Sequence, residues 1–266
     1  LNVLALFTEN FDYQDMRKDF VRGILQCDIL GHRIGCYELA ADEYAARVRS
    51  SHLYDSVSRD IISRWTFPIV PDMNLLEDQE LAIKRGNRYI GRDVMLSRSA
   101  VIGAGTVLGA GVSVGEGTVI TRSVIGPNTT IGPNCRIDGA YLWDSVMVEG
   151  GAVIESSIVA DHVRIRQGVV INRGCMITSQ VTLGPKVSIP ENTRVAKWSD
   201  HLERTLSDMN LGGLDGEGGE VSQVATSLTQ LSATSRAILG PDSDGLLWTT
   251  SLLFDPGNPD EMADLS

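Results

Sequence analysis

This sequence of 266 residues has few cysteines and no long apolar run, the features that mark disulfide-rich, zinc-binding and membrane proteins. Its four cysteines contain no Cys-x-x-Cys pair, which argues against a zinc site or a disulfide framework and favours a reducing compartment. No apolar run approaches the roughly 18 residues that a membrane-spanning helix needs, and no stretch has the pattern of a secretory signal. We therefore expect a cytoplasmic protein without a membrane partner.

Basic residues are also scarce, since 23 Lys and Arg stand against 34 Asp and Glu. The negative charge is concentrated from residue 197 onward, where twelve residues are acidic and three are basic. Because binding to nucleic acid depends on clustered Lys and Arg, we expect no DNA partner. Residues 198–266 are predicted to be a largely disordered acidic linker, since Gly, Ser and Thr dominate their composition. The apolar residues within 246–254 are either residual apolar content or a short motif that docks on a partner.

What the sequence does have is a short unit that repeats from Ile90 to Val195. An aliphatic residue recurs every six positions, except for gaps of five residues after Ile120, Ile137 and Ile154. A period of six fits neither an α-helix nor a coiled coil, whereas hexapeptide repeats mark a parallel β-helix. The three short gaps lie 17 residues apart. They therefore predict one corner of the β-helix that is tighter than the others on successive coils.

The residues before the repeat have a different pattern. Apolar spacing predicts a strand, a helix, a strand and a helix over residues 1–7, 13–26, 29–39 and 52–65. This order is typical of an α/β domain, but four elements are too few to enclose a core. Because the chain also begins without Met, we expect a fragment. The predicted division is residues 1–71 for part of an α/β domain, 72–88 for a linker, 89–197 for the β-helix and 198–266 for the acidic linker.

Two classes of enzyme are known for hexapeptide repeats, namely acyltransferases and sugar-nucleotide pyrophosphorylases. The former need a His as general base, and the only His in the repeat, His162, follows a turn-like position without a pocket-forming loop. The latter need a Gly-rich phosphate loop, and residues 1–89 contain none. No residues predict a catalytic, metal or cofactor site. We favour a scaffold or interaction protein and keep either enzyme as the alternative.

Two large side chains within the repeat are candidate interface anchors. Tyr141 and Trp143 are large apolar side chains that we expect to be exposed on the β-helix, and aromatic residues dominate many protein interfaces. The alternative is that both pack against the preceding α/β block or against an insertion, because aromatic side chains are as often buried within a fold as at interfaces.

Several stretches of the chain resemble the epsilon subunit of eukaryotic translation initiation factor 2B. They are residues 8–14 (TENFDYQ), 17–25 (RKDFVRGIL), 43–48 (EYAARV), 61–65 (IISRW), 141–143 (YLW) and 178–181 (TSQV), together with Tyr54. The sister gamma subunit resembles them less well. The resemblance implies a pyrophosphorylase-like α/β block, a left-handed β-helix and an acidic linker. It also implies that the start of the α/β domain and the catalytic helical domain are absent.

The function that the resemblance implies is guanine nucleotide exchange on translation initiation factor 2. Exchange needs no covalent chemistry, because a protein that binds the nucleotide-free state more tightly lowers nucleotide affinity by linkage. Asn10 and Phe11 are implied to contact the GTP-binding subunit of initiation factor 2, although a loop Asn beside a buried Phe is the alternative. The implied partners are the other subunits of initiation factor 2B, gamma first and also beta, delta and alpha, in a hetero-oligomer. A purely structural subunit is a third hypothesis.

Overall fold

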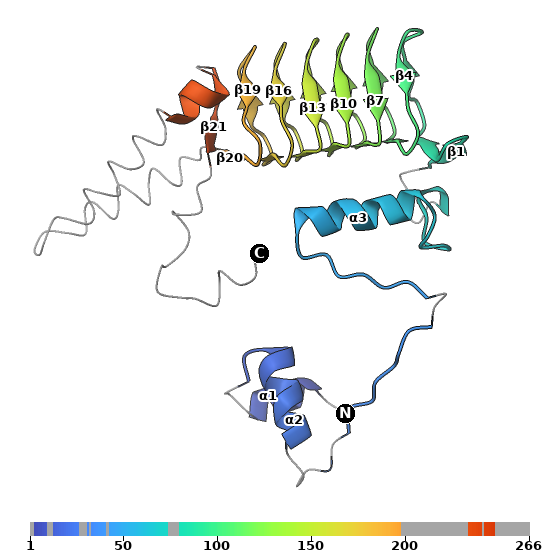
Figure 1. Ribbon diagram of the computed structural model, residues 1–266, viewed down its shortest axis with the longest axis vertical. Helices are drawn as coiled ribbons and strands as arrows, with labels where there is room; N and C mark the ends of the chain where they lie inside the picture. The colour runs from blue at the N-terminus through green and yellow to red at the C-terminus, as the bar shows by residue number, and fades with distance from the viewer. Residues whose placement is uncertain are drawn as a thin grey trace, which may run out of the picture. The chain divides into compact units, whose positions relative to one another are not determined.

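The computed structural model describes residues 3–9, 13–26, 31, 33–40, 43–73, 80–197, 234–240 and 242–247 (Figure 1). The chain divides into two units, Leu1–Ala46 and Arg47–Ser266. The first unit is a small helical cluster, and the second contains the predicted β-helix.

Three short helices make up the first unit: α1 (Val3–Glu9), the π-helix η1 (Met16–Val21) and α2 (Arg22–Gln26). The Asp15 carboxylate accepts hydrogen bonds from the first backbone N–H groups of η1, which would otherwise have no acceptor within the helix. Leu6, Phe20 and Ile24 form the buried core of the unit. The cluster is therefore held together by a few apolar contacts and one helix cap.

The strand predicted over residues 1–7 is wrong, because residues 3–9 form α1. A short apolar run does not distinguish a strand from a helix by periodicity, and Leu and Ala favour the helix. Residues 31 and 33–39, the described part of the second predicted strand, form no strand either. The helix predicted over residues 13–26 is confirmed from residue 16 onward. The α/β character of residues 1–71 thus remains a prediction.

The second unit begins with α3 (Ser51–Ile62), which the sequence predicted over residues 52–65. The Ser50 side chain caps it by accepting a hydrogen bond from the N–H of Leu53, 3.3 Å away. The helix ends at Ile62, because Arg64 adopts a positive φ of 71°. The short 3₁₀-helix η2 (Pro71–Met73) follows.

The β-helix is built of three sheets whose strands stack coil upon coil. Sheet 1 contains β1 (Ala82–Lys84), β2 (Arg88–Ile90), β5 (Val107–Leu108), β8 (Val124–Ile125), β11 (Tyr141–Leu142), β14 (Ile158–Val159), β17 (Met176–Ile177), β20 (Arg194–Lys197) and β21 (Gly245–Leu247). Sheet 2 contains β3 (Met95–Leu96), β6 (Ser113–Val114), β9 (Thr130–Ile131), β12 (Met147–Val148), β15 (Arg164–Ile165) and β18 (Thr182–Leu183). Sheet 3 contains β4 (Val101–Ile102), β7 (Val119–Thr121), β10 (Arg136–Asp138), β13 (Val153–Glu155), β16 (Val170–Ile171) and β19 (Ser188–Ile189).

All neighbouring strands are parallel except at the two ends of sheet 1, where β1 pairs with β2 and β21 pairs with β20 in antiparallel fashion. The strand β1 lies within residues 72–88, so part of the stretch predicted as a linker already belongs to the sheet. The β-helix predicted from the hexapeptide period is confirmed.

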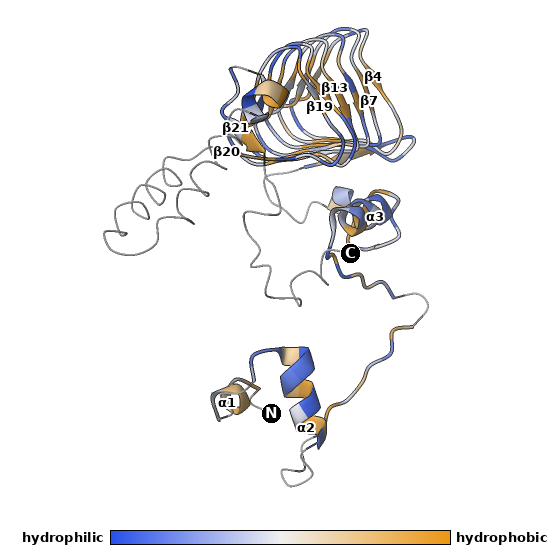
Figure 2. Ribbon diagram, turned by 60° about the vertical axis from the view of Figure 1, so that its left-hand side comes forward, coloured by the Kyte–Doolittle hydropathy of each residue, from blue (hydrophilic) through white to orange (hydrophobic). Residues whose placement is uncertain are grey.

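The repeated aliphatic residues point inward and stack on one another. Leu108, Ile125 and Leu142 are successive partners in sheet 1, and each is at most 1% exposed. Figure 2 shows apolar residues recurring along the stacked coils. Because the ladder hydrogen bonds run between coils, each coil depends on its neighbours for both backbone pairing and burial.

The predicted tight corner also exists. Partners on adjacent coils are 17 residues apart from Val107 to Val124 and from Val124 to Tyr141, but 18 apart from Tyr89 to Val107. On these coils the connection from sheet 3 to sheet 1, which follows β7, β10 and β13, is one residue shorter than on the other coils. The shortened hexads therefore fix the register of the three central coils.

The last coil is covered by a later part of the chain. Residues 234–239 form a helix, and β21 pairs Leu247 with Val195 and Gly245 with Lys197. Leu239 is fully buried against the core. The prediction that residues 198–266 are largely disordered is therefore wrong for residues 234–240 and 242–247. The physical reason is that the last coil would otherwise expose apolar side chains and unpaired backbone groups, which these residues cover. Of the predicted apolar island, Leu246 and Leu247 pack on this chain's own β-helix, and residues 248–254 lie outside the described residues.

Candidate functional site

Of the side chains that the sequence singled out in the repeat, Tyr141 lies on sheet 1, and Trp143 and His162 lie at one of its two flanking corners. The short corner joins sheet 3 to sheet 1 and contains residues 121–123, 138–140 and 155–157. The open corner joins sheet 1 to sheet 2 and contains residues 126–129, 143–146 and 160–163. The two corners flank the strands of sheet 1, so every coil contributes to both.

The outer face of sheet 1 is covered by α3. The Tyr141 hydroxyl donates a hydrogen bond to Asp55 Oδ1 at 2.7 Å, and the rings of Tyr54 and Tyr141 meet edge to face with centroids 5.0 Å apart. At the other end of the helix, the Tyr89 hydroxyl donates to the Ile62 carbonyl oxygen at 2.9 Å. The helix thus lies along the stacking direction of the coils, and a tyrosine of sheet 1 holds each of its ends.

Tyr141 is 5% exposed. The sequence left open whether Tyr141 anchors another protein or packs within the chain. In the structure, it packs within the chain, against α3. The side chain therefore has little free surface for contact with a separate protein, and its anchoring contacts are Tyr54 and Asp55 of α3.

The ionisable groups beneath α3 are shifted by these contacts. Burial raises the pKa of Tyr141, and the hydrogen bond to Asp55 raises it further. Burial also raises the pKa of Asp55, but hydrogen bonds from Arg59 and Tyr141 outweigh it, so the net pKa is lowered. Both shifts keep the hydroxyl protonated and the carboxylate charged, which is the state that the Tyr141–Asp55 hydrogen bond requires.

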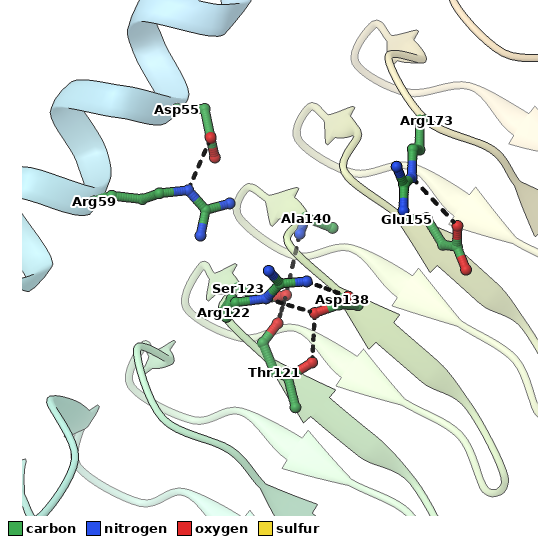
Figure 3. A network of polar contacts seen from close by, with 9 residues as sticks. All are labelled: Asp55, Arg59, Thr121, Arg122, Ser123, Asp138, Ala140, Glu155 and Arg173. Atoms are coloured by element: carbon green, nitrogen blue, oxygen red, sulfur yellow. Dashed lines mark hydrogen bonds and ion pairs between the residues drawn. The ribbon is translucent and has the colours of Figure 1, made fainter.

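The short corner carries a row of ion pairs (Figure 3). Arg122 Nε and Nη2 donate to the two carboxylate oxygens of Asp138 at 3.1 and 2.5 Å, and the Thr121 hydroxyl donates to the same carboxylate at 2.6 Å. On the next two coils, Arg173 Nε lies 3.8 Å from Glu155 Oε2 and forms a second ion pair. These carboxylates thus find an arginine on a neighbouring coil.

Arg59 of α3 faces the same row of side chains (Figure 3). Its Nε donates to Asp55 Oδ2 at 2.8 Å. A Cβ atom added to Gly139 would lie 3.6 Å from Arg59 Nη2, which places the guanidinium directly over this turn. The positive φ of 66° at this turn is the conformation that favours glycine.

The sequence did not identify Asp55, Arg59, Arg122 or Asp138. A signal was present, because Arg122 and Asp138 have opposite charges and lie within successive five-residue gaps. That signal becomes specific only when the coil register is known.

The open corner differs in both cover and charge. Trp143 is 43% exposed. The residue at the same position on the preceding coil is Gly126, where an added Cβ would lie 2.5 Å from the Trp143 carbonyl carbon. Neighbouring backbones therefore approach closely enough at this corner to exclude a side chain at this position of the preceding coil.

Two carboxylates follow Trp143 on successive coils. Asp161 Oδ1 accepts a hydrogen bond from the Asp144 N–H at 3.0 Å. Asp144 Oδ1 in turn reaches back over Gly126, where it would lie 2.7 Å from an added Cβ. Partial burial and the negative charge of Asp161 raise the pKa of Asp144. The two acids therefore stack along the corner.

His162, the one residue weighed as a catalytic base, occupies a turn of this corner with φ of 56°. Its backbone N–H donates to the Asp144 carbonyl oxygen at 2.9 Å, and its side chain is exposed. The placement is that of a corner residue.

Asn10 and Phe11 lie outside the described residues. Among the described residues, no three His, Cys, Asp or Glu side chains converge as metal ligands do. No helix in that part of the chain is long and apolar enough to cross a bilayer. Cys135 and Cys175 are buried, and burial raises the pKa of both thiols, which leaves them as apolar filling inside the coils.

Residues 85–189 match the family model described as the EIF2B subunit epsilon LbH domain, a left-handed β-helix. The chain is 51% identical to the translation initiation factor eIF2B subunit epsilon of Schizosaccharomyces pombe over 219 residues, 82% of this chain and 32% of that protein. The subunit of the same name from Dictyostelium discoideum is 48% identical over 94 residues, 35% of this chain and 13% of that protein. The chain thus spans about a third or less of the length of these curated relatives.

Among solved structures, the chain is similar to a mutant of perosamine N-acetyltransferase from Caulobacter crescentus in complex with CoA and GDP-perosamine. The identity is 14%, the TM-score is 0.42, and the match covers 56% of this chain and 62% of the other. Similarity at this level does not bear on activity.

Proposed function

Because the chain belongs to the family of eIF2B epsilon subunits, we propose that it is part of the exchange factor that promotes GDP release and GTP loading on translation initiation factor 2. The observation that carries this proposal is the 51% identity over 219 residues. That length exceeds the span of residues 85–189 that the β-helix family model matches. The similarity therefore extends beyond the hexapeptide repeat, which unrelated proteins share.

In this function the β-helix acts as a rigid scaffold in a hetero-oligomer, without covalent chemistry of its own. Parallel strands bond each coil to the next, so docking surfaces on it keep fixed spacings. The proposed partners are the other subunits of eIF2B, with gamma nearest, and initiation factor 2 itself. The proposed place of action is the cytoplasm.

We assign the contact with the GTP-binding subunit of initiation factor 2 to Asn10 and Phe11, on the resemblance of residues 8–14 to the epsilon subunit. Exchange by binding alone requires a surface that prefers the nucleotide-free state. Residues 1–71 would then be the end of the pyrophosphorylase-like α/β domain that presents this surface, and the catalytic helical domain would lie outside this chain.

The test is the release of fluorescent GDP from initiation factor 2 by the complete exchange factor carrying Phe11→Ala. We expect exchange to slow about tenfold or more, as for an aromatic anchor at an interface. Phe67→Ala is the matched control, because Phe67 is a 66% exposed Phe in the second unit, and it should change the rate less than about twofold. An unchanged rate with Phe11→Ala in an intact complex would remove this pair from the contact.

A further inference from the structure

Trp143 is the one large residue in its column at the open corner. The same position on the other coils is Gly91, Gly109, Gly126, Ala160 and Thr178. The indole therefore projects from a corner that is otherwise built of small residues. An exposed tryptophan in a well-ordered repeat is a typical anchor for another protein.

Charge indicates what kind of partner would fit. In the described part of the chain, neither Asp144 nor Asp161 forms an ion pair with Lys or Arg, whereas acids of the short corner do. The nearest Lys or Arg along the chain is Arg164, which lies on the outer face of sheet 2. Two stacked carboxylates thus follow the exposed Trp143 at the same corner, without an ion-pairing Lys or Arg among the described residues.

We propose that the open corner at Trp143, Asp144 and Asp161 docks an arginine-bearing segment of a partner protein. The guanidinium stacks on the indole and donates hydrogen bonds to the two carboxylates. Arginine fits better than lysine because its planar group binds an aromatic face and carboxylates together. The inference rests on the proposed function, since it needs a chain whose β-helix is a docking platform.

The geometry suits a single guanidinium. Corresponding atoms on adjacent coils are about 4.8 Å apart, and Asp161 already reaches one coil back to the N–H of Asp144. Each carboxylate keeps acceptor capacity after its contacts within the corner. Partial burial and the negative charge of Asp161 raise the pKa of Asp144, and His162 opposes them only in part. A guanidinium between the two carboxylates would offset their mutual repulsion.

The test uses the full chain and a fluorescein-labelled Gly-Arg-Gly-Arg-Gly peptide, with binding followed by fluorescence anisotropy. We expect Trp143→Ala to weaken binding about tenfold, within the range of a partly desolvated cation–π contact. Asp144→Asn combined with Asp161→Asn should weaken it by a similar factor. The corresponding lysine peptide should bind more weakly than the arginine peptide, and a glutamate peptide should not bind.

Two matched controls separate this corner from general charge and general apolarity. Glu116→Gln removes an exposed acid at a different corner, and Trp65→Ala removes a tryptophan that is 76% exposed elsewhere. Both should leave the peptide affinity within about twofold. No binding to the unaltered chain, or equal losses in the controls and the corner variants, would overturn the inference. Circular dichroism of Trp143→Ala checks that the β-helix is intact.

The outcome can be distinguished from failure of the proposed function. The peptide assay needs no nucleotide exchange, and the Phe11→Ala assay needs no contact at Trp143. If Phe11→Ala slows exchange while the peptide does not bind, the docking inference fails and the function stands. If the peptide binds at Trp143 but the complete factor does not act on initiation factor 2, the function fails while the corner still recognises arginine.

Discussion

Tyr141 and Trp143 are separated by a single residue on one coil, yet the first is 5% exposed and the second 43%. Tyr141 points out from sheet 1 beneath α3, where it contacts Tyr54 and Asp55. Trp143 lies at the start of the open corner, beside Asp144. The same contrast holds for charge, since Asp138 at the short corner is held by Arg122, whereas the acids of the open corner have no such partner among the described residues.

The difference shows how one repeated unit produces two kinds of surface. The anchor positions that recur every five or six residues are fixed by packing on every coil, so they stay aliphatic. Outward positions are constrained only by what covers them. Where α3 covers sheet 1, charges are paired within the chain, because an uncompensated charge near a buried surface is costly. At the open corner, Trp143 is exposed and the described residues supply no Lys or Arg to Asp144 and Asp161, so these groups can receive a partner.

The largest effect should come from truncating the covered residue. Tyr141→Ala removes a buried ring, its contact with Tyr54 and its hydrogen bond to Asp55, and should lower the free energy of unfolding by about 3–4 kcal/mol. Hydrogen exchange should also show weaker protection of the α3 amides. Denaturant unfolding followed by circular dichroism gives the free energy.

Trp143→Ala is the control for that comparison, because it removes a larger ring from the next outward position. Its cost should stay below about 1 kcal/mol, as for an exposed residue that fills no core. A cost for Trp143→Ala equal to that for Tyr141→Ala would show that the two surfaces do not differ as described.

The charged groups should show the same contrast with a smaller effect. Asp55→Asn weakens charge-assisted hydrogen bonds from Arg59 and Tyr141, so we expect a loss of about 1–2 kcal/mol. Asp144→Asn removes one of two neighbouring negative charges, so it should be neutral or stabilising by up to about 0.5 kcal/mol. Thermal unfolding at pH 7 compares the two variants, and destabilisation by both would contradict the assigned charge environments.

The sequence predicted the β-helix well because its period depends on local packing. Nineteen aliphatic anchors repeat with the coils, and the gaps after Ile120, Ile137 and Ile154 located the short corner. Surfaces made by distant segments were harder to predict. Tyr89, Val107, Val124 and Tyr141 form an outward apolar column beneath α3, but the column becomes visible only when register is known.

Two errors have physical causes of the same kind. The run Leu1–Phe7 suits a helix as well as a strand, and only its contacts decide between them. Residues 234–240 and 242–247 cover the last coil only because the chain returns to it after 36 residues outside the described part. Composition alone made that stretch look like part of a disordered linker, because its few apolar residues gain burial only from the end of the β-helix.

The smallest effect should be a difference in acid titration between Asp138 and Asp144. The Arg122 side chain and the Thr121 hydroxyl lower the pKa of Asp138, although partial burial opposes them. Partial burial and Asp161 raise the pKa of Asp144. NMR of the side-chain carboxyl carbons should therefore show Asp138 titrating below the usual value for Asp, roughly 3.9, and Asp144 titrating above it.

These shifts have opposite consequences for stability. The contribution of Asp138 is present above the unfolded pKa and is lost as the pH falls through its lowered folded pKa. Asp144 favours the folded state only while it is protonated, and that contribution is lost as the pH rises through its raised folded pKa. Arg122→Gln should therefore raise the pKa of Asp138 and cost about 0.2–1 kcal/mol at pH 7, the range for an exposed ion pair, while the titration of Asp144 stays unchanged. A parallel shift of both carboxyl groups would mean that the two corners share one electrostatic environment.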